Sequence, residues 1–216
     1  MTFCGERRGL APLPRDFFAR PAEEVAPGLL GCVLTHATPD GEVAVRLTEV
    51  EAYAGSADPA SHAFRRQTSR TAVMFGPPGY VYVYFTYGMH FCMNLVCLPA
   101  GTASAVLVRA GEVVAGEDLA RARRAPLKAG IPSRDLARGP ARLCQALGVD
   151  RTMDGTDACD PSSALRIWKP AVVPSSTVVT GPRVGIREAA DVPWRFWLAG
   201  EATVSAYRAH TRRSRV

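Results

Sequence analysis

Alternation of apolar and polar residues, with the two-residue period of a β-strand, runs through much of the chain. Val33–His36 and the longer Glu42–Tyr53 carry this pattern on either side of the turn signal Pro39-Asp40-Gly41, which predicts a hairpin. Tyr80–Phe85 and Phe91–Leu98 are dense in aromatic and β-branched residues and predict a second hairpin.

Elsewhere the pattern predicts short helices and further short strands. The helices are expected to begin at Asp16 and to cover Ala22–Leu30, Glu117–Arg124 and Ala141–Leu147. The strands are expected at Ala103–Val114, Leu165–Trp168, Ser176–Ile186, Trp194–Leu198 and Ala202–Tyr207. We see no internal repeat or linker, so we expect one α+β domain, a curved, mostly antiparallel sheet flanked by short helices. It should cover residues 16–207, between a flexible, irregular N-terminus (1–15) and a basic, disordered tail (208–216).

The strand Glu42–Tyr53 departs from its own pattern near its end. The period of two places the following residues on one face: Val43, Val45, Leu47, Glu49, Glu51 and Tyr53. Either the strand emerges into solvent at Glu49, or its end lines a pocket. The pattern alone favours emergence, because one-sided strands normally remain apolar on the buried face.

Three other features indicate chemistry without defining it. The long segment Ala54–Pro78 lacks periodicity, and loops of this length are usually functional or disordered. It contains a histidine and three arginines, at positions His62, Arg65, Arg66 and Arg70. These favour function, although a lone histidine is more often structural.

Tyr87 and Arg109 occupy unusual positions for their residue types. Tyr87 lies in the predicted turn Thr86–Met89, where either another loop covers its side chain or it projects towards a partner. Arg109 interrupts an otherwise apolar strand, and a buried charge at that position needs a partner.

Composition is that of a globular protein. The 216 residues are 47% hydrophobic, contain no apolar run long enough to cross a membrane, and begin without the features of a signal peptide. We therefore expect a cytosolic (cytoplasmic) protein with no membrane partner. The six cysteines lack C-x-x-C or metal-ligand spacing, so we expect them to be reduced, with Cys32, Cys92 and Cys144 in the core.

The net charge of +6 comes almost entirely from arginine, since only Lys128 and Lys169 are lysines. Arginine pairs well with phosphate and stacks on aromatic rings. A GC-rich genome would also enrich arginine, so basicity alone supports nucleic-acid binding weakly. The phosphate-binding, dinucleotide-binding, zinc-protease and nucleophile-elbow motifs are absent from the sequence.

Several short motifs, in order and at matching spacing, resemble the alkyladenine (3-methyladenine) DNA glycosylases of the mammalian type, in a bacterial form. They are Glu49-Val50-Glu51-Ala52-Tyr53, Arg66-Gln67-Thr68, Met74-Phe75, Tyr82-Val83-Tyr84, Tyr87-Gly88-Met89, Cys92-Met93-Asn94, the run Gly139 to Leu147, Arg183-Val184-Gly185-Ile186 and Trp194-Arg195-Phe196. The resemblance runs from Phe17 to about Tyr207. It implies an enzyme that removes alkylated or deaminated purines from double-stranded DNA by cutting the N-glycosidic bond, with no cofactor or metal and as a monomer.

The resemblance also implies roles for individual residues. Glu51 would be the catalytic base that activates water, Arg109 would help to hold that water and a phosphate, and Glu49 would be structural. A main-chain carbonyl within Arg183–Ile186 would be a further ligand of the water. A carboxylate suits this reaction because the transition state resembles an oxocarbenium ion.

Other residues would bind the DNA. Tyr53, His62 and Tyr84 would sandwich the flipped base, with cation–π attraction to an alkylated purine of about 0.5–2 kcal/mol per contact. Asn94 would exclude guanine, Tyr87 would intercalate into the duplex, and Met74 would lie beside it at the DNA surface. Arg65, Arg66, Arg70 and the segment Arg121–Arg124 are weaker candidates for phosphate contacts.

The chain departs from the mammalian pattern at His90, where those members have tyrosine, and lacks their N-terminal extension. Both lysines lie outside the motif region, so we expect no Schiff-base chemistry and a monofunctional enzyme.

Two other hypotheses are a non-catalytic module that stacks damaged or single-stranded nucleic acid on its tyrosines, and a metal-dependent hydrolase using Glu49, Glu51 and His62. The first leaves Glu51 without a role, and the second lacks the usual ligand spacing.

Overall fold

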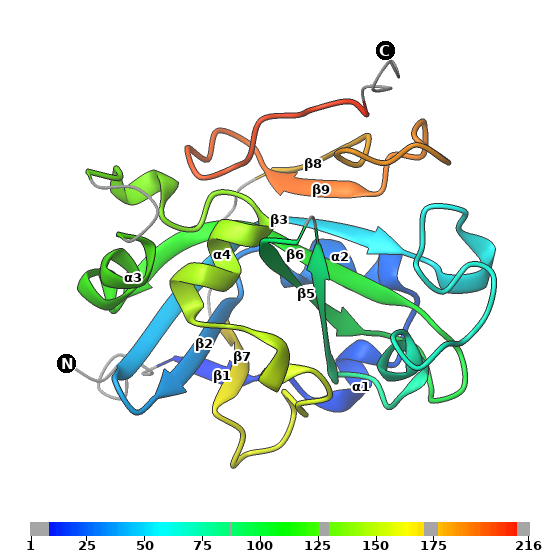
Figure 1. The fold of residues 1–216 in the computed structure, drawn as a ribbon, viewed down its shortest axis with the longest axis horizontal. Helices are drawn as coiled ribbons and strands as arrows, with labels where there is room; N and C mark the ends of the chain where they lie inside the picture. Colours follow the sequence, from blue (N-terminus) through cyan, green and yellow to red (C-terminus); the bar gives the residue numbers. More distant parts are fainter. Residues whose placement is uncertain (1–8, 87, 126–129, 171–176, 211–216) are drawn as a thin grey trace.

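The computed structural model describes residues 9–86, 88–125, 130–170 and 177–210. They form an α+β domain built on one antiparallel sheet, as the sequence predicts (Figure 1). The strands are β1 (Leu10–Pro12), β2 (Val33–Thr38), β3 (Gly41–Tyr53), β4 (Val81–Thr86), β5 (His90–Val96), β6 (Ala105–Ala115), β7 (Leu165–Pro170), β8 (Val178–Gly181) and β9 (Arg195–Leu198). The helices are α1 (Arg15–Phe18), α2 (Ala22–Leu29), α3 (Glu117–Arg124) and α4 (Pro140–Leu147). Short 3₁₀ turns cover Gly55–Ala57, Ala72–Phe75, Ser133–Asp135 and Arg151–Met153.

Strand β3 is the centre of the sheet, whose order is β1-β7-β2-β3-β6-β5-β4. Its first half pairs with β2 in the predicted hairpin, and β6 runs along its other edge. Its second half pairs with β9, which in turn pairs with β8, so this two-stranded ribbon extends along the end of β3 (Figure 1). The end of β3 is thus covered by strands from far along the chain.

An irregularity in β3 changes which residues face the core. The register against β6 shifts between Leu47 and Glu49 and again between Glu49 and Val50. The core face therefore passes from Val43, Val45 and Leu47 to Val50 and Ala52, all of which belong to the main hydrophobic cluster. The prediction that Glu49, Glu51 and Tyr53 share the face of Leu47 is wrong, because the bulge places them on the opposite face.

Helices α2 and α4 supply apolar faces to the same core. The contributing residues are Ala22, Val25, Ala26 and Leu29 from α2 and Leu143, Cys144, Ala146 and Leu147 from α4. Pro140 occupies the first turn of α4, where it needs no N–H partner. The helix ends at Leu147, and Gly148 forms its C-cap in the left-handed conformation, with a φ of 73°.

The β4–β5 hairpin ends with the pair Thr86–His90, and Gly88 in its turn has φ of 67°. Phe85 and Met89, the apolar residues near this turn, are 45% and 68% exposed. Tyr87 itself lies outside the described residues.

Three of the predicted segments differ from the structure. Leu10–Pro12 is not irregular but pairs with β7, because the exposed edge of β7 offers it hydrogen bonds. Ala202–Tyr207 forms no strand; its Ser205 instead bonds to Glu49. Ser176, the first residue of the predicted strand Ser176–Ile186, lies outside the described residues. Within 177–186 the strand covers Val178–Gly181, since its pairing with β9 ends at Gly181. No helix among the described residues is long and apolar enough to cross a membrane.

Candidate active site

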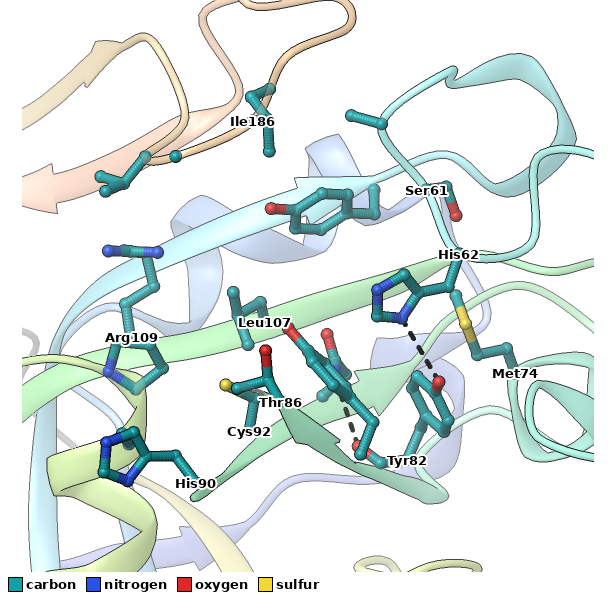
Figure 2. A pocket seen from close by; sticks show the side chains of 18 residues that line it. Ser61, His62, Met74, Tyr82, Thr86, His90, Cys92, Leu107, Arg109 and Ile186 are labelled. Atoms are coloured by element: carbon teal, nitrogen blue, oxygen red, sulfur yellow. Dashed lines mark hydrogen bonds between the residues drawn. The ribbon is translucent and has the colours of Figure 1, made fainter. Parts of the chain in front are cut away.

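A cavity of about 390 Å³ opens beside the end of β3. Its walls come from β3, β4, β5, β6, the loop that follows β3, the start of α4 and the segment after β8 (Figure 2). The lining residues are Tyr53, Ala60, Ser61, His62, Met74, Tyr82, Tyr84, Thr86, His90, Cys92, Asn94, Leu107, Arg109, Pro140, Ala141, Val184, Gly185 and Ile186. Such a concave, largely apolar site with a few polar groups is typical of a small-molecule or nucleobase pocket.

Glu51 lies directly behind the cavity wall and is fully buried. Its Oε1 accepts a hydrogen bond from the Val184 main-chain N–H at 2.7 Å and lies 3.2 Å from Arg109 Nη1. Its Oε2 accepts one from the Tyr53 hydroxyl at 2.8 Å. Burial and the Glu51 charge raise the pKa of Tyr53 well above its ordinary value, so that hydroxyl remains protonated. The prediction that the strand simply emerges into solvent here is therefore wrong.

Glu49, also fully buried, is held by two arginines and by the C-terminal segment. Arg109 Nε and Arg195 Nε donate to its Oε1 at 2.7 and 2.8 Å. The Ser205 main-chain N–H donates to its Oε2 at 2.6 Å. Burial by itself would raise the pKa of Glu49, but Arg109 and Arg195 outweigh it and hold that pKa below its ordinary value. Glu49 is thus a fixed, ionised anchor.

Arg109 connects the two carboxylates. It is 5% exposed, and its remaining nitrogen, Nη2, donates to Ser205 Oγ at 3.4 Å. Burial would lower the pKa of Arg109, whereas Glu51 and Glu49 raise it above its ordinary value. The requirement of a partner for this charge, predicted from the apolar strand pattern, is confirmed. Figure 2 shows Arg109 and His62 at opposite sides of the cavity.

Aromatic rings form the other side of the cavity. His62 lies edge-on to Tyr84, with ring centroids 4.5 Å apart, and Tyr84 stacks against Tyr82 at 5.7 Å. His62 Nδ1 lies 3.3 Å from the Tyr82 hydroxyl. Loss of surrounding water, together with the charge of Arg70, lowers the pKa of His62, so its imidazole is neutral at neutral pH. The structure brings Tyr53, His62 and Tyr84 to one cavity.

Asn94 and Met74 also line the cavity. Asn94 is 5% exposed and donates from Nδ2 to the Tyr82 carbonyl at 3.2 Å. Met74 is 3% exposed and packs in a second apolar cluster with Ala63 and Tyr82. The expected place of Met74 beside the wedge at the DNA surface stays a prediction.

The arginines of the long loop differ in their surroundings. Arg65, Arg66 and Arg70 are all exposed. Arg70 alone of the three has a recorded ring contact among the described residues, with its guanidinium carbon 5.8 Å from the Tyr84 centroid.

Pattern reading missed four groups that hold the site together: Arg183, Asp58, Arg195 and the Val184 main-chain N–H. Arg183 and Asp58 form a buried ion pair, with Arg183 Nη2 donating to Asp58 Oδ1 at 2.9 Å. The Arg183 guanidinium also lies 4.7 Å from the Tyr53 ring centroid. Arg195 is the first residue of the otherwise apolar strand β9, so a charge in an apolar strand, the signal that marked Arg109, could have indicated it. No local sequence pattern indicates a role for Asp58 or for the Val184 main-chain N–H.

Other sequence predictions concern cysteines and metals. Cys32 and Cys144 lie in the main core and Cys92 lines the cavity, and all the described cysteines are free. Among the described residues there is no group of three or more His, Cys, Asp or Glu side chains that could hold a metal ion.

A model of the methylpurine-DNA glycosylase family matches residues 16–202, which include the whole cavity. The chain belongs to the methylpurine-DNA glycosylase family. It is therefore a DNA glycosylase, a hydrolase that acts on the N-glycosidic bond, as the sequence motifs predicted.

Similar proteins carry the name "Putative 3-methyladenine DNA glycosylase". One from Streptomyces avermitilis is 57% identical, covering 94% of this chain and 95% of its own. One from Frankia casuarinae is 52% identical over 93% and 95% of the two chains. One from Burkholderia lata is 49% identical over 90% and 91%. The glycosylase thus shares nearly its whole length with these relatives.

Proposed function

We propose that this glycosylase removes alkylated or deaminated purines from double-stranded DNA as a monofunctional enzyme, in the first step of base-excision repair. Its substrates would be of the 3-methyladenine, 7-methylguanine, hypoxanthine and ethenoadenine class. The observation that carries this proposal is a buried carboxylate, Glu51, held by three donors directly behind an aromatic-lined cavity large enough for a purine base.

The proposed reaction is a hydrolysis in which Glu51 accepts a proton from water. The water oxygen forms a bond to C1′ of the deoxyribose while the bond from C1′ to the purine nitrogen breaks, and that electron pair leaves with the base. A purine alkylated at N3 or N7 leaves as a neutral molecule, whereas a neutral purine takes up a proton. The negative charge of Glu51 also stabilises the oxocarbenium-like transition state.

Arg109 supports this chemistry through its position. Its guanidinium contacts Glu49 and Glu51 and also lines the cavity, so it holds the carboxylate of Glu51 and presents N–H groups to a water. A main-chain carbonyl within Arg183–Ile186 is the proposed further ligand of that water. Glu49 fixes Arg109 and takes no part in proton transfer.

The flipped base is proposed to lie between Tyr53 on one side and His62 and Tyr84 on the other. Asn94 lines the same cavity, and we propose that it excludes normal guanine by crowding its 2-amino group. Extruding a nucleotide costs a few kcal/mol of stacking and pairing. A snug aromatic site offsets part of that cost.

The β4–β5 hairpin is proposed to enter the duplex with Tyr87 as its wedge. Support comes from its exposed apolar neighbours Phe85 and Met89, which would otherwise face water. We propose that Arg65 and Arg66 contact phosphates. Tyr87→Ser should weaken binding to a lesion-containing duplex, and unchanged affinity would refute the wedge.

The decisive experiment uses Glu51→Gln on a labelled duplex that contains hypoxanthine or ethenoadenine. We expect base release to be abolished while DNA binding is retained. Retained base release would remove Glu51 as the base. Failure of the native chain to release any base would instead favour a non-catalytic module that only binds DNA.

The same duplex tests for monofunctional chemistry. The native chain should leave an intact strand that breaks only after alkali, because an abasic site is alkali-labile. A strand cut before alkali, or a borohydride-trapped adduct at Lys169, would refute this part of the proposal.

A further inference from the structure

Positive charge lies against the aromatic walls of the cavity. The Arg183 guanidinium carbon is 4.7 Å from the centroid of Tyr53, and that of Arg70 is 5.8 Å from the centroid of Tyr84. Both tyrosines line the cavity, whereas neither arginine does. Each ring therefore already interacts with a cation that lies outside the cavity.

Arg183 is paired with Asp58, whereas Arg70 forms no ion pair with another described residue and leaves its charge unbalanced beside the cavity. Among the described residues no acidic side chain lines the cavity, while Arg109 does. Glu51 lies behind the wall, and its two oxygens are occupied by the Tyr53 hydroxyl, the Val184 N–H and Arg109. Among these charges of the described residues, that of Arg70 is therefore the one without an ionic partner beside the cavity.

This unbalanced charge affects the two chemical classes of damaged purine differently. A purine alkylated at N3 or N7 carries a positive charge before the glycosidic bond breaks, whereas hypoxanthine and ethenoadenine are neutral. An unperturbed tyrosine face attracts a cation. A guanidinium already near the ring draws on the same electron density and repels a second cation, and a neutral base escapes that repulsion.

We infer that the charge of Arg70 beside Tyr84 makes this enzyme discriminate by the charge of the base, disfavouring cationic alkylpurines relative to neutral damaged purines, so that Arg70 is a specificity-determining residue. This inference rests on the proposed function and refines its substrate class.

The setting of Arg70 suits such a role. It lies in a tight turn in which the Thr71 N–H donates to the Thr68 carbonyl at 3.0 Å and the Thr68 N–H donates to Thr71 Oγ1 at 2.9 Å. Thr71 is 3% exposed, so the turn is anchored. Burial and the charge of Arg70 both lower the pKa of His62, another residue that lines the cavity. Arg70 also bonds to the buried Tyr82 hydroxyl, which keeps His62 Nδ1 as a partner when Arg70 is replaced.

The test compares Arg70→Gln with the native chain on two duplexes of the same sequence, one with 7-methylguanine and one with hypoxanthine. The readout is the kcat/KM for 7-methylguanine divided by the kcat/KM for hypoxanthine. The two bases also differ in the 2-amino group and in leaving-group chemistry, but these differences affect both proteins alike. A change in the ratio between the two proteins therefore reports the charge of Arg70. We expect the ratio to rise about two- to fivefold in Arg70→Gln, the size of an exposed electrostatic interaction.

Arg66→Gln is the matched control, because it removes the same charge from the same loop. Any loss of phosphate contacts should affect both duplexes alike, leaving the ratio at its native value. A duplex with ethenoadenine, bulky but neutral, should follow hypoxanthine in every protein. An unchanged or lower ratio in Arg70→Gln, or an equal rise in Arg66→Gln, would overturn the inference. If the native chain released neither base, the proposed function itself would fail.

Discussion

The ion pair between Arg183 and Asp58 offers a direct test of how the cavity wall is held. Both residues are 1% exposed. Arg183 Nη1 also donates to the Ala52 carbonyl at 2.9 Å, so this one side chain ties β3 to the segment after β8. Arg183→Met removes the charge and the hydrogen bonds but keeps a long, apolar side chain.

The expected loss of unfolding free energy follows from the donors that remain around Asp58. Without Arg183, the Asp58 carboxylate is buried with only the main-chain N–H groups of Ala54 and Ala60 as donors. Removing one partner of a buried ion pair costs about 3–5 kcal/mol of unfolding free energy. For a domain of this size that corresponds to a decrease in Tm of about 6–20 °C.

The assay is urea unfolding of Arg183→Met, Asp58→Asn and the double variant at pH 7. The double variant buries no unpaired charge, so its loss should be smaller than the sum of the single losses by about 1–3 kcal/mol. Arg65→Met, at an exposed arginine, is the control and should stay within about 0.5 kcal/mol of the native chain.

Two outcomes would refute this reasoning. A loss of less than about 1 kcal/mol in Arg183→Met would mean that water reaches Asp58 and solvates its charge. Additive losses in the double variant would mean that Arg183 and Asp58 act independently.

Three further predictions concern the carboxylates. Because the pKa of Glu49 is lower in the folded than in the unfolded chain, its contribution to stability is full above the unfolded pKa and lost as pH falls through the folded pKa. Urea midpoints should therefore fall more steeply below about pH 4 for the native chain than for Glu49→Gln, and parallel profiles would contradict this. Tyr53→Phe keeps the ring but loses the hydrogen bond to Glu51, so kcat should fall about 10- to 100-fold with little change in KM; an unchanged kcat would show that this bond does not orient the base. EDTA should leave base release intact, because Glu49 and Glu51 are already bonded to Arg109, and loss of activity would revive the metal-dependent hypothesis.

Much of the fold could be predicted because it is locally encoded. The two hairpins follow from period-two patterns flanked by turn residues, and α3 has the predicted bounds because its polar sequence has a helical period. The segments that were wrong, Leu10–Pro12 and Ala202–Tyr207, are those whose structure depends on what lies beside them. A free strand edge recruits the first, and Glu49 binds the second.

The sequence by itself determined which residue types are available to the site: a pair of carboxylates at the end of β3, an arginine inside an apolar strand and a set of aromatic rings. Only the tertiary structure decided their relation. The bulge at Leu47–Val50 turns Glu51 and Tyr53 towards the cavity. The sequence shows the apolar residues moving from odd positions up to Leu47 to the even positions Val50 and Ala52, but only the pairing with β6 shows that a bulge causes this. Arg183 and the Val184 N–H reach Glu51 and Tyr53 from more than a hundred residues away, because β9 pairs with the end of β3. Burial then makes these contacts strong, since charges removed from water must satisfy one another.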